Sequence, residues 1–265
     1  MESPLQPIYC LADSQLLFWH EEDRGEPWLA SLLEGPLAGA GLPDEEGLRA
    51  AYVGASNGDE PAFYSIFRAA VEAVGIADHR MILSGFGKED RGFLASADLV
   101  VLSGGDPVRG WRIFEQSGLQ EAITRRYFEG AVLLGVSAGA VQLGWAAAPE
   151  EPESAAGGEA GLDPGDVALT FRLVPAVVGV HEEDRDWEGL RRLLRASGAT
   201  VRGLGIPSGG GLAYHPDGVI EPIRHPVHEL VIDEGRLRHS LLLPGSESQA
   251  AAAAVAASGA AERTN

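Results

Sequence analysis

Residues 132–140 read Val-Leu-Leu-Gly-Val-Ser-Ala-Gly-Ala and constrain the fold more than any other stretch of the chain. An apolar run that passes directly into Gly-x-Ser-x-Gly is typical of a buried strand that turns sharply into a helix. Such a turn strains the backbone at Ser137 and exposes its hydroxyl, while Gly135 and Gly139 keep side chains out of the turn. The pattern predicts a nucleophile at Ser137 and an oxyanion donor at the Ala138 amide. Taken alone, it fits equally well a glycine-rich turn that carries a serine by chance.

A second apolar run, residues 97–102, ends in a glycine pair. The glycines allow backbone N–H groups to face outward at the end of the strand. The carboxyl ends of neighbouring parallel strands meet at the edge of a sheet where ligands bind, so we expect this turn to lie beside Ser137. One N–H from Gly105 or Asp106 and one from Ala138 would then form a two-donor oxyanion hole.

Most of the chain alternates predicted strands with predicted helices. The strands are predicted at residues 7–12, 48–55, 81–83, 97–102, 132–136, 171–180 and 201–207, and the helices at 60–75, 88–94, 110–130 and 187–197. Residues 16–19 extend the opening strand or form a hairpin with it, and residues 211–214, 218–220 and 230–232 are predicted closing antiparallel strands. This order predicts an α/β fold, a mostly parallel sheet with helices on both faces.

The length of 265 residues suffices for one large α/β domain, predicted over residues 1–245. Residues 246–265 are rich in Ala and Ser and are predicted to form a disordered tail. Residues 149–166 are acidic and aperiodic, and predict a surface loop close to the site.

A formal net charge of −19 argues against nucleic acid or an anionic membrane as a partner. No apolar run approaches the roughly 18–20 residues that a membrane span needs, and the first residues lack the pattern of a signal peptide. The single cysteine, Cys10, excludes an internal disulfide and is interpreted as a buried apolar residue. These features predict a cytoplasmic protein, and they leave open whether it is a monomer or a homodimer.

Together, Gly104-Gly105-Asp106 and the stretch from Gly135 to Ala140 resemble the peptidase E and cyanophycinase family of serine peptidases. In that family, a strand ending in Gly-Gly-[Asn/Asp] is followed by a helix and by a strand ending in Gly-x-Ser-Ala-Gly-Ala. The resemblance runs from about residue 48 to about residue 221. It implies a fold like that of class I glutamine amidotransferases, a Ser-His centre, small acidic peptides as substrates, and neither cofactor nor metal.

A serine hydroxyl is a weak nucleophile without a base, and the resemblance places the base at His181. The family's base follows the strand after the nucleophile helix, and His181 ends the apolar run 171–180. His215, in a predicted turn, is the weaker alternative. His225 and His228 have a spacing that metal sites use, but no third ligand is evident, so no metal is expected there.

The third catalytic position departs from the family, which has an acid after Gly-Ile-Pro or Gly-Ile-Asp. Here residues 205–209 read Gly-Ile-Pro-Ser-Gly, so Ser208 stands where the acid is expected. Three alternatives remain open. One of Glu182, Glu183 and Asp184 supplies the charge, Ser208 orients a slow Ser-His dyad, or the chain has kept the fold and lost hydrolysis.

The substrate is specified by few residues. The family cleaves after an N-terminal aspartate or releases β-linked Asp-Arg units, so an arginine in the site is expected. Arg109, Arg112 and Arg185 are candidates by position, and Asp106 is a further candidate for substrate contact. Two other functions stay open: a catalytically silent binding module on the same scaffold, and an α/β-hydrolase esterase. The esterase lacks support, because the chain has no His-Gly-Gly-Gly motif.

Overall fold

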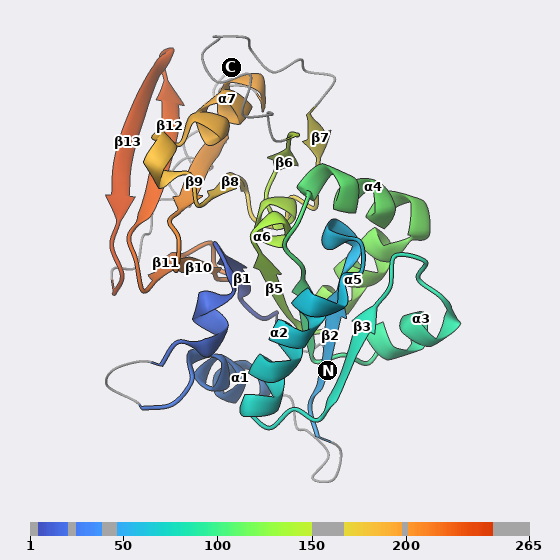
Figure 1. Cartoon of the computed structure of the whole chain (residues 1–265). Helices are drawn as coiled ribbons and strands as arrows, with labels where there is room; N and C mark the ends of the chain where they lie inside the picture. Colours follow the sequence, from blue (N-terminus) through green and yellow to red (C-terminus); the bar gives the residue numbers. More distant parts are fainter. Residues whose placement is uncertain (1–4, 21–24, 39–46, 150–166, 198–200, 246–265) are drawn as a thin grey trace, which may run out of the picture.

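The computed structural model describes residues 5–20, 25–38, 47–149, 167–197 and 201–245 (Figure 1). The predicted tail at 246–265, and the predicted loop at 149–166 apart from its first residue, lie outside the described residues. Within the described chain, no helix combines the length and apolarity needed to cross a bilayer.

A seven-stranded main sheet forms the centre of the molecule (Figure 1). Its strands, in spatial order, are β11 (Ile220–Ile223), β10 (Gly211–Tyr214), β1 (Ile8–Leu11), β5 (Val132–Val136), β4 (Leu99–Leu102), β2 (Arg49–Val53) and β3 (Asp78–Ile82). The strands from β1 to β3 are parallel, and β10 and β11 are antiparallel additions beside β1. The predicted mostly parallel sheet with closing antiparallel strands is confirmed.

Helices cover both faces of the main sheet, as predicted. The α-helices are α1 (Trp28–Ala38), α2 (Pro61–Ala73), α3 (Lys88–Leu94), α4 (Pro107–Ser117), α5 (Leu119–Phe128), α6 (Ala138–Leu143) and α7 (Glu188–Ser197). Along β1, Ile8 and Cys10 pack with α4, α5 and α6, whereas Tyr9 and Leu11 pack with α1 and α2. The central strands β1, β5 and β4 are therefore buried on both sides, which explains their continuous apolar runs in the sequence.

A second, four-stranded sheet lies beside the main sheet and carries α7 on one face (Figure 1). Its order is β13 (Arg236–Leu242), β12 (Val227–Asp233), β9 (Arg202–Ile206) and β8 (Ala176–Val180), with β8 and β9 parallel and the other pairs antiparallel. A short ribbon of β6 (Ala146–Ala147) and β7 (Ala168–Leu169) completes the strands of the described chain. The sequence predicted neither β13 nor the separation into two sheets.

Two local predictions were wrong. Residues 16–19 do not form a strand, because Leu16 and Leu17 are both buried, and consecutive buried residues suit a helical turn better than an alternating strand. Residues 16–18 belong to the 3-10 helix η1 (Ser14–Phe18), whose first turn is capped by Asp13, and Trp19 follows it in an extended conformation. The helix predicted over 110–130 is two helices, because Gly118 adopts φ +82° and separates α4 from α5.

Candidate active site

Ser137 occupies a strained turn between β5 and α6. Its φ of +50° and ψ of −111° are rare for a residue with a side chain. A Cβ at Gly135 would overlap the backbone of Gly139, and a Cβ at Gly139 would overlap the carbonyl group of Leu102 on β4. Both positions of the Gly-x-Ser-x-Gly pattern therefore need glycine for packing, and the turn holds the half-buried Ser137 at the end of its strand.

His181 lies directly after β8 and faces Ser137. Its backbone N–H donates to the carbonyl oxygen of Ile206 on β9 at 3.0 Å, and its φ is +44°. The Nε2 of the exposed His181 ring is 3.0 Å from the Oγ of Ser137. The structure thus brings together the two residues that the sequence singled out, one from the main sheet and the other from the second sheet.

The glycine turn after β4 lies beside Ser137. A Cβ at Gly104 would be 3.4 Å from the Cβ of Ser137, and Gly105 has φ +128°. The Asp106 amide donates to the carbonyl oxygen of Ser56 at 3.0 Å and is therefore engaged. Within the described residues, the amides of Gly105 and Ala138 have no acceptor. Of the two donors considered after β4, Gly105 is thus the free one.

A buried glutamine holds this turn in place. Gln142, on α6, is fully buried and donates through Nε2 to Ser56 Oγ at 3.0 Å and to the Pro107 carbonyl oxygen at 2.8 Å. It thereby joins the nucleophile helix to the start of α4 and to the 3-10 helix η2 (Ala55–Asn57). The sequence analysis missed Gln142, although a single amide within an apolar helix next to the serine is a detectable signal.

The third catalytic position predicted from the sequence lies at the carboxyl ends of β8 and β9. Val180 pairs with Ile206, so Ser208 lies close to His181, where the family places its acid. The Glu183 Oε1 accepts a hydrogen bond from the Ser208 amide at 3.0 Å. Glu182, predicted as a candidate, is directed elsewhere, because its Oε2 accepts from the Leu190 amide at the start of α7 at 3.0 Å.

The family model for peptidase family S51 matches residues 79–220, more than half of the chain and the whole stretch that contains Ser137, His181 and Ser208. This chain belongs to peptidase family S51. Membership in this family supports a peptidase-like hydrolase. It favours the peptidase interpretation of Gly-x-Ser-x-Gly over an α/β-hydrolase esterase. No curated protein matches the chain in sequence.

Two solved structures share the S51 chain's fold. A peptidase from an acI-B1 Actinobacterium superposes with a TM-score of 0.66 at 17% identity, over 94% of this chain and 98% of the other. A putative peptidase E protein from Listeria monocytogenes EGD-e superposes with a TM-score of 0.53 at 13% identity, over 90% of this chain and 100% of the other. At these identities, the likeness concerns the fold alone.

Two of the four candidates for substrate contact in this S51 chain, Asp106 and Arg185, have different surroundings. Asp106 caps α4, since its Oδ1 accepts from the amides of Val108 and Arg109, both at 2.9 Å. Arg185 is exposed on the 3-10 helix η5 (Glu183–Arg185) and makes no ion pair with another described residue. Asp106 thus has a structural role that its position in the sequence did not indicate.

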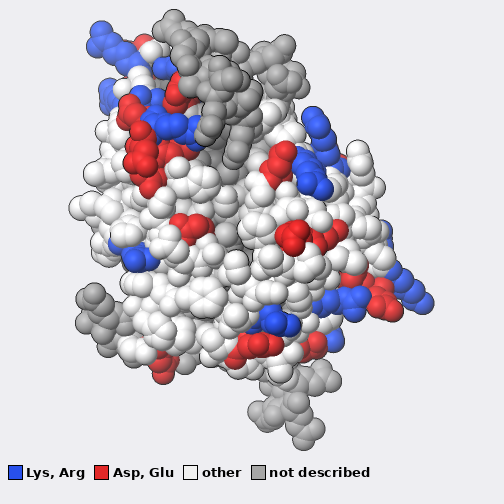
Figure 2. All heavy atoms as spheres, viewed as in Figure 1, with Lys and Arg blue, Asp and Glu red and all other residues white. Residues whose placement is uncertain are grey.

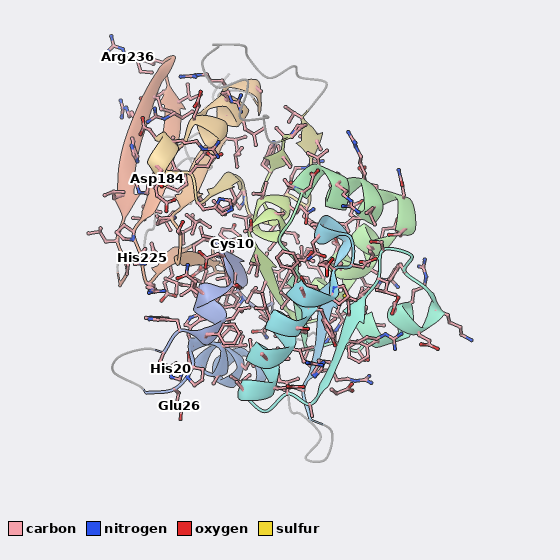
Figure 3. The ribbon with its side chains drawn as sticks, in the orientation of Figure 1. Cys10, His20, Glu26, Asp184, His225 and Arg236 are labelled. Carbon is pink, nitrogen blue, oxygen red and sulfur yellow. The ribbon has the colours of Figure 1, made fainter. Side chains whose placement is uncertain are left out.

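The remaining histidines and Cys10 take no part in the contact between Ser137 and His181. His215 bonds to Glu221 at 2.9 Å, and His228 pairs with His239 at 2.8 Å rather than with His225. Among the described residues, no group of three or more His, Cys, Asp and Glu side chains is arranged to hold a metal ion. Cys10 is fully buried on β1, in the centre of Figure 3, and burial raises the pKa of its thiol to about 12.

Proposed function

We propose that this S51 chain is a serine-type peptidase that hydrolyses small acidic peptides. The observation that carries the proposal is the 3.0 Å contact between Ser137 Oγ and His181 Nε2, made at a strained strand-to-helix turn. Strain of this kind is retained where the surrounding structure needs a particular side-chain direction. The proposed nucleophile is Ser137, and the proposed general base is His181.

The contact allows a complete acyl-transfer cycle. His181 Nε2 takes the hydroxyl proton as Ser137 Oγ attacks the scissile carbonyl carbon. The carbonyl oxygen becomes an oxyanion and accepts hydrogen bonds from the amides of Gly105 and Ala138. The imidazolium then protonates the leaving amine, the C–N bond breaks, and an acyl-enzyme remains. Water, deprotonated by His181, releases the acid and regenerates the serine. Each oxyanion donor is worth about 10²–10³-fold in rate.

Arg109 supports the preference for an acidic substrate. Its exposed guanidinium group lies against Gly58, and the neighbouring Asn57 approaches Gly105, so the cation lies on the oxyanion side of the site. Arg109 has no ion-pair partner among the described residues. On the face drawn in Figure 2, acidic and basic side chains are interspersed, and the chain carries a net charge of −19. Binding of a substrate carboxylate would therefore depend on an individual arginine rather than on a broad basic surface.

A fluorophosphonate probe tests the nucleophile directly, because it reacts with serines activated by a base. We expect one modified residue, Ser137, and no modification in Ser137→Ala. Ser65→Ala is the control, since Ser65 is exposed on α2 and should leave the labelling of Ser137 unchanged. Modification of Ser103 or Ser208 instead would contradict the assignment of the turn.

A binding module without turnover is the second candidate function. It is favoured by Ser208, which is exposed and carries no charge where the family has its acid. A wild-type protein that neither reacts with the probe nor cleaves Asp-X dipeptides, but binds them, would establish this second function.

A further inference from the structure

His181 needs a partner on the side of its ring that faces away from Ser137. Nε2 is engaged by the serine, so the proton that holds the ring in the productive tautomer is on Nδ1. In serine triads, a carboxylate accepts this proton's hydrogen bond and stabilises the imidazolium. Ser208 cannot supply that charge.

Glu183 is the carboxylate that bonds to Ser208 and interacts electrostatically with His181. It follows His181 by two residues, in η5, and Oε1 accepts the Ser208 amide at 3.0 Å. Its second oxygen, Oε2, is buried and has no hydrogen-bond partner among the described residues. A buried carboxylate oxygen without a donor is costly, so it marks a place where a donor is expected during function.

The two neighbouring acids are directed away. The Glu182 carboxylate bonds to the Leu190 amide and lies against Gly189, so it belongs to the start of α7. Asp184 is exposed and lies beside the start of α7 (Figure 3). Of the three consecutive acids, Glu183 alone bonds to Ser208.

We propose that Glu183 is the positioning residue for His181, and that Ser208 holds Glu183 instead of replacing it. In this chain the acid lies in the turn after β8, whereas the family has it at the end of β9. At the family's position, the Ser208 amide donates the hydrogen bond that fixes the Glu183 carboxylate. This assignment deepens the proposed function and rests on it.

Glu183 is kept ionised for this role. Burial favours the neutral carboxyl, but hydrogen bonds from the Ser208 side chain, the Glu183 amide and the Ser208 amide, together with the charge of His181, hold the pKa of Glu183 below its ordinary value. The charge is therefore present at neutral pH, where it can stabilise the imidazolium of His181.

His228, a titratable group close to Glu183, does not neutralise it. His228, on β12, packs its ring against Trp187 at 4.9 Å and bonds through Nδ1 to His239 Nε2 at 2.8 Å. Burial and the charge of His239 lower the pKa of His228, and they outweigh Glu183 and Asp186, which raise it. His228 is thus uncharged at neutral pH. Asp186 carries an ion pair with Arg191 at 2.7 Å.

The test compares Glu183→Gln with Asp184→Asn, its exposed neighbour. With an Asp-X dipeptide, Glu183→Gln should lower kcat by about 10²–10⁴-fold with little change in KM, because the ring loses its orienting charge. Asp184→Asn should keep the wild-type rate. The double variant Glu183→Gln/Ser208→Glu, which returns the acid to the family's position, should recover activity.

Retention of the wild-type rate by Glu183→Gln, or an equal loss in Asp184→Asn, overturns the assignment while leaving Ser137 and His181 in place. The NMR signal of the His181 Nδ1 proton tests the same interaction without turnover. Glu183→Gln should move this signal upfield, and an unchanged signal overturns the proposal. Failure of the wild type to react with the fluorophosphonate probe would instead count against the proposed function.

Discussion

Ser137 and His181 meet across the junction of two sheets, and both residues have a positive φ angle, +50° and +44°. Each of these backbone conformations costs on the order of 1–3 kcal/mol. The strain is located at the two residues whose side chains touch, where it sets the direction in which Oγ and Nε2 leave the backbone. A residue's position at a strand end brings it near the site, but the strained turn makes the contact.

The glycine at position 105 should tolerate no larger residue. In Gly105→Ala, the new Cβ would overlap the Ser56 carbonyl group at a φ of +128°, so the turn that carries the proposed oxyanion donor must shift. We expect kcat to fall by about 10²-fold, the value of one misplaced donor. Gly92→Ala is the control, because that position in α3 is open. Similar kcat values in the two variants would contradict the role of Gly105.

Gln142→Met should destabilise the protein and reduce activity together. Methionine fills a similar volume but leaves Ser56 Oγ and the Pro107 carbonyl oxygen without their donor. Each orphaned group costs about 1–3 kcal/mol, which urea unfolding measures. Gln116→Met, on the exposed side of α4, should leave both quantities unchanged. Equal stability of the two variants would show that the buried network is dispensable.

Arg109→Ala should raise KM for an Asp-X dipeptide by about tenfold or more, while leaving KM for an Ala-X dipeptide unchanged. The reason is the loss of the cation beside Gly58, which lies on the oxyanion side of the site. Arg112→Ala removes an exposed arginine from the same helix and serves as the control. If both variants lose the same affinity for Asp-X, general charge rather than a specific contact selects the substrate.

Stability should decline in mild acid, partly through His228. The folded state holds the pKa of His228 below its ordinary value of 6.5, so the unfolded chain binds more protons between the folded pKa and 6.5. The free energy of unfolding therefore falls as the pH drops through this window. His228→Phe keeps the contact with Trp187 and removes the titration, so its stability should depend less on pH there. Parallel curves for the two proteins would contradict this.

Glu183 also loses its contribution to stability in acid, at a lower pH than His228. Its folded pKa lies below the ordinary 4.5, so its hydrogen bonds contribute stability above that pH and lose it as the pH falls through the folded pKa. The difference in unfolding free energy between the wild type and Glu183→Gln should therefore be present at neutral pH and shrink in acid. Chemical denaturation at several pH values measures it, and a constant difference would exclude a contribution from the charge.

The sequence predicted those parts of the site that depend on local pattern. Residues 132–140 and the glycine pair after residue 102 each form a complete turn, so their geometry follows from short-range sterics. The pairing of β12 with β9 and β13 depends on contacts between distant parts of the sequence. The hydrophobic pattern of residues 236–242 did not predict strand β13. The choice among Glu182, Glu183 and Asp184 likewise depends on how η5 turns, since each residue of a tight turn points in a different direction.

The order of Ser137 and His181 along the chain has a consequence for synthesis. The proposed nucleophile leaves the ribosome 44 residues ahead of the proposed base, and β10 and β11, which complete the main sheet beside β1, follow both. Domains with such long-range pairing fold late, once most of the chain is available. A nascent chain that ends before β8 carries the serine without the histidine and is chemically inert. Hydrolysis would begin only when the last strands are in place, so the newly made protein is inactive until its own folding is finished.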